Sequence, residues 1–340
     1  MHQHGLFDIQ MRHEEIKQYT TMLDKLNSII NWEDFRPTLE IIRNKERKSN
    51  AGRKPFDVIL MFKIMILQSL YNLSDEKMEF QIKDRFSFMA FLELQLNDDV
   101  PDEKTIWLFR DELTKADLVK PLFDQFEKIL STNGFTAKKG QIVDAAIISA
   151  PKQRNSHDEN KQIKEGNPPE EWESKPNKKC QKDVDARWTK KRNVNYFGYK
   201  NHVNVDAKHK FIRQYEVTSA SVHDSQVLEE LLNEKNSSKK VYADSAYSGA
   251  KISKLLKEQG LHNQINKKGY RNRPLTSKQQ ASNQTKSKTR CRVEHVFGIQ
   301  SQRAGGLLLR CIGIVRAKTK IGLQNLSYNM SRYAMLKGSG

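Results

Sequence analysis

The sequence predicts an α+β (mixed α/β) protein in which an all-helical N-terminal region precedes a mixed β-sheet covered by helices. Two observations carry this prediction. Apolar residues recur at helical spacing up to about residue 130, whereas short, nearly continuous apolar runs typical of buried strands begin after Gly134. The first three of these runs follow one another as hairpins, and the later ones alternate with helical patterns, as in a sheet with antiparallel and parallel strands.

The N-terminal helices are marked by apolar periodicity and by capping residues. Pro55 is placed for the first turn of a strongly apolar helix, and Ser74 and Asp102 are placed as N-caps of two more. Short helices joined by tight turns are typical of a helix-turn-helix-like DNA reader, and a plain helical packing domain is the alternative. The expected helices are 23–30, 32–42, 55–70, 75–86, 103–113 and 118–130.

The second half of the chain is expected to form the sheet and its covering helices. The polar segment 151–193 is interpreted as an insertion or mobile loop, and the basic segment 267–289 as a loop. The expected strands are 141–148, 196–205, 211–218, 240–244 and 262–266, and the expected helices are 223–232, 250–259, 291–302 and 321–335.

These elements predict a domain organisation. Residues 1–133 would form a helical, DNA-end-binding domain, and residues 134–337 the sheet domain with its insertion at about 151–193. Residues 338–340 are interpreted as a flexible tail. The basic stretch Arg43–Lys54 is either a solvated linker or a DNA contact.

The chain is strongly basic. Its 340 residues include 59 Lys and Arg against 41 Asp and Glu, which gives a net charge of +18. After Glu258, the only acidic residue is Glu294. A basic tail of this kind needs a polyanion, and nucleic acid is the usual one. A basic scaffold for acidic protein partners is an alternative.

The sequence also predicts a cytoplasmic protein. No apolar run reaches the roughly 18–20 residues needed to cross a bilayer, and the first residues lack the basic and apolar regions of a signal peptide. Three cysteines, Cys180, Cys291 and Cys311, form no CxxC pair. This argues against a disulfide framework or a zinc finger and fits a reducing compartment.

Three carboxylates stand in unusual places. Asp144 interrupts an apolar strand, where an unpaired charge costs several kcal/mol. Asp244 ends a second apolar strand, and Glu294 lies alone in a basic helix. If the two strands are neighbours, both aspartates reach one edge of the sheet and Glu294 approaches from a covering helix. Three such oxygen ligands select Mg²⁺ or Mn²⁺, and two ions roughly 4 Å apart can drive in-line phosphoryl transfer.

Each carboxylate also has a structural interpretation. Asp144 could cap a turn or pair with a buried arginine, and Asp244 could begin an Asx-turn. Glu294 could form an ion pair with Arg290, one helical turn earlier. Asp206 and Asp224 compete as metal ligands, although Asp206 lies in a hairpin and Asp224 is better explained as a helix-start acid.

Histidines are secondary candidates for catalysis. His202, His223 and His295 lie near the carboxylates in sequence or in the expected fold. A lone histidine is more often a structural residue than a catalytic one, so both interpretations remain open.

Four ordered blocks of the sequence resemble those of DDE transposases. The blocks are Val143–Pro151, Tyr196–Asp206, Ala243–Gly249 and Arg290–Gly298. The chain is most similar to the bacterial insertion-sequence-five group, and residues 4–130 also resemble the N-terminal domain of that group. The resemblance implies a ribonuclease-H-like core in which Asp144, Asp244 and Glu294 form the DDE triad and hold two Mg²⁺ or Mn²⁺ ions.

The family signature around the glutamate is matched in part. It reads Tyr-x2-Arg-x3-Glu-x6-Lys, and Arg290 and Glu294 match it. Ser287 replaces the tyrosine and Ser301 replaces the lysine. The carboxylates are not affected by these departures.

The resemblance implies a bacterial, nucleoid-associated enzyme that binds the terminal inverted repeats of an insertion sequence. It would cleave DNA at the element ends and join the 3′-OH to target DNA, as a homodimer or larger assembly on double-stranded DNA. The alternatives are a catalytically decayed DNA-binding repressor and a ribonuclease-H-like nuclease without strand transfer.

Several residues are candidates for contacting DNA. Arg290 would clamp a phosphate. Trp188 could stack on an unpaired base, or pack at the flank of a hairpin. The candidates for contacting the DNA backbone are Lys200, Lys267, Lys268, Arg271, Arg273 and Arg292.

Overall fold

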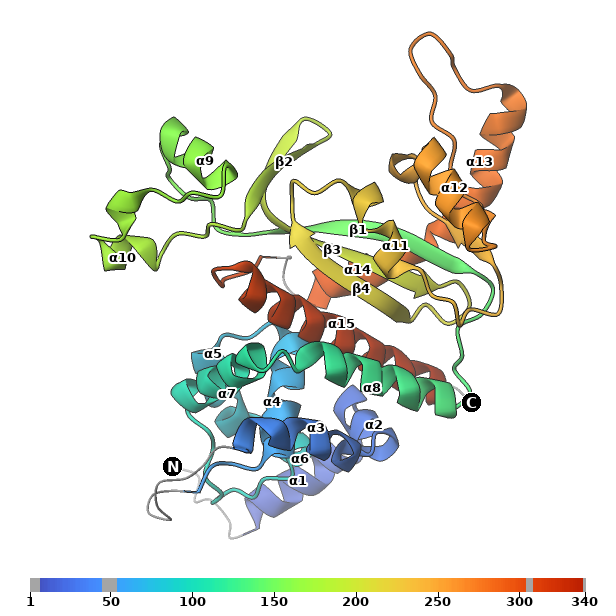
Figure 1. Cartoon of the computed structure of the whole chain (residues 1–340). Helices are drawn as coiled ribbons and strands as arrows, with labels where there is room; N and C mark the ends of the chain where they lie inside the picture. The colour runs from blue at the N-terminus through green and yellow to red at the C-terminus, as the bar shows by residue number, and fades with distance from the viewer. Residues whose placement is uncertain (1–6, 45–53, 304–307, 339–340) are drawn as a thin grey trace. The chain divides into compact units, whose positions relative to one another are not determined.

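The computed structural model describes residues 7–44, 54–303 and 308–338 (Figure 1). The chain forms two compact units, one from Met1–Phe126 with Leu323–Gly340 and the other from Glu127–Gly322. Helices α8 (Val119–Thr132) and α15 (Ile314–Lys337) have residues in both. The predicted functional boundaries, 1–133 and 134–337, stay predictions. Most of the basic stretch after Arg43, and residues 339–340 of the expected tail, lie outside the described residues.

The first unit is helical, as predicted. Its core is the apolar helix α4, where buried Phe62 packs against the rings of Trp32 and Phe35. Besides α8 and α15, its helices are α1 (Asp8–Lys17), α2 (Met22–Ile29), η1 (Trp32–Phe35), α3 (Arg36–Leu39), η2 (Glu40–Arg43), α4 (Val58–Tyr71), α5 (Asp75–Asp84), α6 (Phe86–Leu92) and α7 (Glu103–Lys115).

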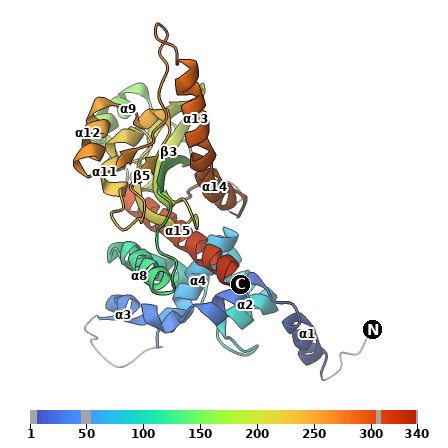
Figure 2. The same ribbon diagram turned by 90° about the vertical axis from the view of Figure 1, so that its right-hand side faces the viewer.

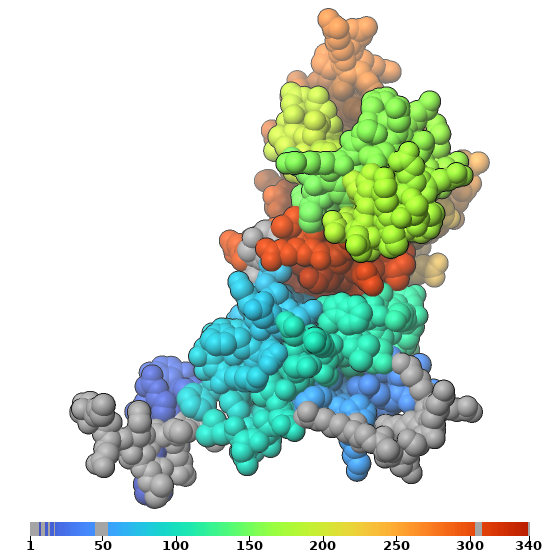
Figure 3. Space-filling view, turned by 90° about the vertical axis from the view of Figure 1, so that its left-hand side faces the viewer, coloured from blue at the N-terminus to red at the C-terminus, as the bar shows by residue number. Residues whose placement is uncertain are grey.

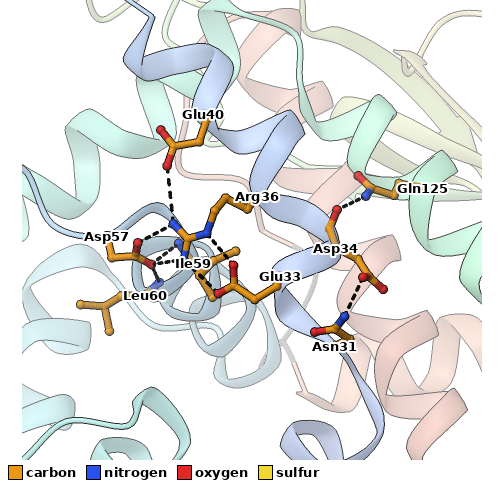
Figure 4. A network of polar contacts seen from close by, with 9 residues as sticks. All are labelled: Asn31, Glu33, Asp34, Arg36, Glu40, Asp57, Ile59, Leu60 and Gln125. Carbon is orange, nitrogen blue, oxygen red and sulfur yellow. Dashed lines mark hydrogen bonds and ion pairs between the residues drawn. The ribbon is translucent and has the colours of Figure 1, made fainter.

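Capping side chains set several helix starts in this unit. Ser74 and Asp102 cap α5 and α7 as the sequence predicted. The prediction that Pro55 opens the next helix was wrong, because α4 begins at Val58 after the N-cap Asp57. Asp57 also accepts from Arg36 at 2.6 Å, within the polar network of Figure 4. The carboxylate of Asp57 accepts from the backbone N–H groups of Ile59 and Leu60 in the first turn, whereas the side chain of Pro55 has no acceptor for such groups.

In the described part of the chain, no single helix is both long and apolar enough to cross a membrane. Helices α4 and α5 pass a length and composition test only as a pair, across a bend of 102°.

The second unit contains a six-stranded mixed sheet of the predicted ribonuclease-H-like class. The path is β2-β3-β1-β5-β6, and β4 pairs with β3. β1 and β4 run antiparallel to β3, whereas β5 runs parallel to β1 and β6 parallel to β5. The strands are β1 (Gln141–Ser149), β2 (Arg187–Lys191), β3 (Val194–Asp206), β4 (Ile212–Ser219), β5 (Lys240–Tyr242) and β6 (His262–Asn263).

The two faces of β1 have different surroundings. Val143 belongs to a buried cluster with Val241 and with residues of α11 (Leu228–Leu231) and α12 (Ala250–Glu258). Side chains alternate along a strand, so Asp144 points to the opposite face. Helix α14 (Arg292–Arg303) contacts β1 and buries Val293 and Val296.

The segment 151–193 was interpreted as an insertion or a mobile loop, and of these alternatives the loop is wrong because the segment contains helices. It contains α9 (His157–Lys164), η3 (Glu170–Trp172) and α10 (Pro176–Lys179), and appears as a green lobe in Figure 3. Buried Trp172 donates from its Nε1 to Glu159 at 3.1 Å. A small local core therefore forms despite the polar composition. The last residues of the segment form β2, whose hairpin with β3 turns through Arg192 and Asn193, both with positive φ.

The prediction of a loop at 267–289 was also wrong in part. Helix α13 (Ser277–Arg290) occupies most of it, and Figure 2 shows this helix and the preceding loop extending away from the sheet. Its surface is polar throughout, so no apolar period marks it. The sequence feature that could have indicated this helix is the capping box of Thr276 and Gln279, in which each side chain accepts from the backbone N–H of the other residue. The final helix, α15, starts seven residues before the predicted 321.

Candidate active site

Asp144 on β1 and Asp244 just after β5 each follow, by two residues, the last paired residues of these neighbouring strands. The parallel pairing of β1 with β5 places Ile142 beside Tyr242, two residues before each aspartate. The condition that the sequence interpretation placed on these strands, that they are neighbours, is therefore met. Asp244 also caps η5 (Ser245–Tyr247), since its Oδ1 accepts from the backbone N–H of Ala246 at 2.8 Å. The Asx-turn interpretation is therefore correct as well, and it fixes one carboxylate oxygen.

Arg290 connects the remaining carboxylates. It ends α13 and donates from one guanidinium nitrogen to Asp144 Oδ2 at 3.0 Å, and from the other to Glu294 Oε1 at 3.0 Å. Glu294 stands in the first turn of α14 and is 61% exposed, whereas Asp144 is only 17% exposed. Both structural interpretations are therefore correct. Asp144 pairs with an arginine and Glu294 pairs with Arg290, and the same Arg290 side chain forms both ion pairs.

The electrostatic environment of Asp144 favours a cation beside it. Burial raises the pKa of Asp144 to about 6. The Ala145 N–H and the Arg290 charge act to lower this pKa, and the Asp244 charge acts to raise it. A buried carboxylate next to a second carboxylate is costly unless positive charge is supplied.

The donor set fits a hard divalent cation in its chemistry. Three carboxylates without sulfur ligands suit Mg²⁺ or Mn²⁺. Within residues 7–44, 54–303 and 308–338, no group of three His, Cys, Asp or Glu side chains is arranged to hold a metal ion. The guanidinium of Arg290 bonds one oxygen of Asp144 and one of Glu294.

Two predicted DNA contacts have protein partners. Lys200 donates to Asp224 Oδ1 at 2.8 Å and to the Val222 carbonyl at 2.7 Å. Arg292 donates to the carbonyl of Ala207. Asp224 begins η4 (Asp224–Gln226), as expected of a helix-start acid. Lys200 and Arg292 would have to give up these bonds to contact a phosphate, so their roles as DNA contacts stay predictions.

Four other candidates are freely accessible. Lys267, Lys268, Arg271 and Arg273 are exposed in the segment that precedes α13. Trp188 packs against Phe197 with ring centroids 5.2 Å apart, yet stays 44% exposed. The hairpin-flank interpretation of Trp188 is therefore correct, and an exposed part of its ring remains.

The histidines divide into one buried and two exposed residues. His202 is fully buried on β3, and its Nε2 bonds Thr218 Oγ1 at 2.8 Å. His223 caps η4 and bonds Ser225 Oγ through Nδ1 at 2.7 Å. His295 is exposed on α14. None of the bonds described for His202 or His223 reaches the triad.

His202 should make stability depend on pH. Burial lowers its pKa to about 4; the Lys200 charge also acts to lower it, and the charges of Asp224 and Glu216 act to raise it. The neutral form is thus favoured by folding, and this stability is lost as pH falls from about 6.5 towards about 4. We expect His202→Gln to reduce the slope of the unfolding free energy between pH 7 and pH 5, which for one proton is at most about 1.4 kcal/mol per pH unit. Urea unfolding at several pH values measures this, and equal slopes in both proteins would contradict it.

Tyr247 is a buried polar residue beside this site that the sequence patterns did not indicate. Its side chain is fully buried, and its hydroxyl has no hydrogen-bond partner among the described residues. Burial raises its pKa, and the charges of Asp224, Asp144 and Asp244 add to the rise. The sequence feature that could have indicated Tyr247 is its position three residues after Asp244, in the turn that this aspartate caps.

Comparison with known proteins identifies two matching family models. The model described as "Transposase DDE domain" matches residues 136–330, and the model described as "Transposase domain (DUF772)" matches residues 11–112. Among solved structures, the chain is similar to one in the "Cryo-EM structure of piggyBac transposase synaptic complex with hairpin DNA (SNHP)". The TM-score is 0.46 and the identity 11%, over 96% of this chain and 77% of that chain.

Proposed function

The chain belongs to the DDE transposase family, and on that premise we propose that it binds the terminal inverted repeats of an insertion sequence, cleaves DNA at the element ends and joins the 3′-OH to target DNA. The observation that carries this proposal is the set of carboxylates around Arg290. Asp144 and Asp244 each come two residues after the last paired residues of the parallel strands β1 and β5, and Arg290 bonds both Asp144 and Glu294. Membership of the insertion-sequence-five group and a dimeric or larger DNA complex are part of the proposal.

Asp144, Asp244 and Glu294 would hold the divalent ions, two per site. When bound, such ions supply the charge that activates the attacking oxygen and stabilises the leaving oxygen of the phosphodiester. The protein's own contribution is orientation. The η5 turn fixes Asp244, and the buried face of α14 fixes the backbone of Glu294 beside β1. Orientation of this kind is what brings reacting groups together at high effective concentration.

Arg290 would contact DNA after leaving the carboxylates. Its planar guanidinium can donate two parallel bonds to a phosphate, as it now donates to Asp144 and Glu294.

The exposed basic segment before α13 would position the DNA backbone. We expect the triple variant Lys268→Ala, Arg271→Ala and Arg273→Ala to bind DNA at least about tenfold more weakly at moderate salt. Its plot of log affinity against log salt should be less steep by up to about 3, about one for each phosphate that the variant no longer neutralises. Fluorescence anisotropy with a labelled duplex at four salt concentrations measures both quantities.

A matched control removes the same charge elsewhere. Three exposed lysines on α12 serve for this, Lys251, Lys254 and Lys257, each replaced by Ala. An equal decrease of salt dependence in the control would mean that general charge is sufficient and that the segment before α13 does not bind DNA specifically.

Strand transfer is the test of the proposed function. The protein is incubated with Mg²⁺ or Mn²⁺, labelled DNA that ends in the inverted repeats of its own element, and a target plasmid. We expect metal-dependent joining of labelled ends to the plasmid, and no joining with scrambled ends. Cleavage without joining would favour the nuclease, and tight binding with neither reaction would favour the repressor.

A further inference from the structure

Arg290 occupies a position between two carboxylates that the proposed function assigns to metal ions. Its two terminal nitrogens bond Asp144 and Glu294, each at 3.0 Å, and it is 22% exposed. The pairing joins residues 146 positions apart in the chain. It therefore links the end of α13 both to β1 and to the first turn of α14.

The pairing satisfies the carboxylates but leaves Arg290 itself incompletely bonded. Its Nε is buried without a hydrogen-bond partner within the described part of the chain. The charge of Asp244, two residues past the end of β5, also acts on Asp144, so loss of the guanidinium would remove the ion-pair partner of a carboxylate that already has a like charge nearby. The ion pairs of Arg290 thus offset the charges of Asp144 and Glu294, but they leave its Nε as one unsatisfied donor.

We propose that Arg290 is the internal counter-cation of this site and sets its affinity for divalent metal, because a metal ion and the guanidinium compete for the same oxygens of Asp144 and Glu294. The proposal rests on the proposed function, since it takes these carboxylates as metal ligands. Metal binding then requires Arg290 to swing away. The side chain released in this way is the one available to a DNA phosphate, so metal and DNA would favour the same position of Arg290.

Metal affinity without DNA tests the competition directly. Isothermal calorimetry with Mn²⁺ is applied to the full-length wild type, Arg290→Met and Arg292→Met. The last variant is a matched control, because it removes the same charge two residues away from a side chain bonded only to a backbone carbonyl in the structure. We expect Arg290→Met to bind Mn²⁺ at least about tenfold more tightly, since two charge-assisted bonds no longer compete. Arg292→Met should stay within about twofold of wild type.

Thermal unfolding gives a second readout that does not depend on catalysis. Without metal, Arg290→Met should unfold at a lower temperature than wild type, because the largely buried Asp144 loses its ion-pair partner. Added Mn²⁺ should then raise the unfolding temperature of Arg290→Met by more than that of wild type. Arg290→Lys, which keeps the charge, should lie closer to wild type in both respects.

The outcomes separate the two proposals. Unchanged or weaker Mn²⁺ binding by Arg290→Met, with clear binding by wild type, would overturn the counter-cation role and leave the proposed function standing. An equal gain in Arg290→Met and Arg292→Met would also overturn it, since general charge would explain the effect. A third outcome is that wild type, Arg290→Met and Arg292→Met all fail to bind Mn²⁺ at concentrations at which wild type carries out strand transfer. This would overturn the proposal that Mn²⁺ and the Arg290 guanidinium compete for Asp144 and Glu294.

Discussion

Asp144→Asn is expected to lower both end cleavage and strand transfer by at least about a thousandfold, because it removes a charged ligand at the centre of the proposed site. DNA affinity should stay within about twofold, since Asp144 is only 17% exposed and repels phosphate rather than binding it. Asparagine can still accept a hydrogen bond from Arg290, so the protein should remain folded. Gel assays with labelled element ends measure cleavage and joining, and anisotropy measures binding.

Two further aspartates make this result specific. Asp158→Asn changes the same charge at a side chain that is 90% exposed in the insertion, and should leave activity unchanged. Asp224→Asn removes the partner of Lys200 and tests the competing ligand assignment. Full activity of Asp144→Asn would contradict the assignment of Asp144 to the catalytic triad. Loss in Asp224→Asn equal to that in Asp144→Asn would mean that Asp224 belongs among the ligands.

The two aspartates could be singled out from the sequence because local patterns mark them. Asp144 and Asp244 each follow β-branched or apolar residues in a short run, and a charge in such a run needs a reason. The pairing of their strands was only a condition of the sequence interpretation. The helical pattern before β5 joins it to β4, yet β5 pairs with β1, and local patterns do not encode this strand order.

The side-chain pairing of Arg290 could not be predicted in the same way. The sequence offered Glu294 as its partner because four residues separate them on a helix. Its second partner, Asp144, is 146 residues away, and no local periodicity encodes which of many basic residues meets it. Helix α13, which carries Arg290 to that point, has no apolar stripe, so its sequence pattern is that of a loop.

The structural role of Asp206 shows the same limit. Its position in a hairpin argued against a metal ligand, but its partners could not be named. In the structure it is fully buried, accepts from the backbone N–H of His209 at 2.6 Å and from Arg213 Nε at 3.0 Å. Arg213 is also buried, and its other nitrogens bond Glu127 at 2.6 Å and the Phe135 carbonyl at 2.8 Å. The pair links the β3–β4 hairpin to the segment that precedes β1.

Arg213→Met should therefore destabilise the protein by about 3–5 kcal/mol, because it leaves the buried charge of Asp206 without its ion-pair partner. Methionine fills much of the volume of the arginine stem, so the loss reports the charge more than a cavity. Urea unfolding at pH 7, followed by circular dichroism, measures the change in the free energy of unfolding.

The double variant Arg213→Met with Asp206→Asn isolates the cause. Removing both charges should recover a large part of the loss, since a neutral amide is far less costly to bury than a carboxylate. Asp206→Asn should also leave Mn²⁺ affinity unchanged, whereas Asp244→Asn should weaken it. A loss below about 1 kcal/mol in Arg213→Met would mean that water or another group stabilises Asp206. Weakened Mn²⁺ binding by Asp206→Asn would instead place this aspartate among the metal ligands, so the two measurements together assign each buried aspartate to structure or to chemistry.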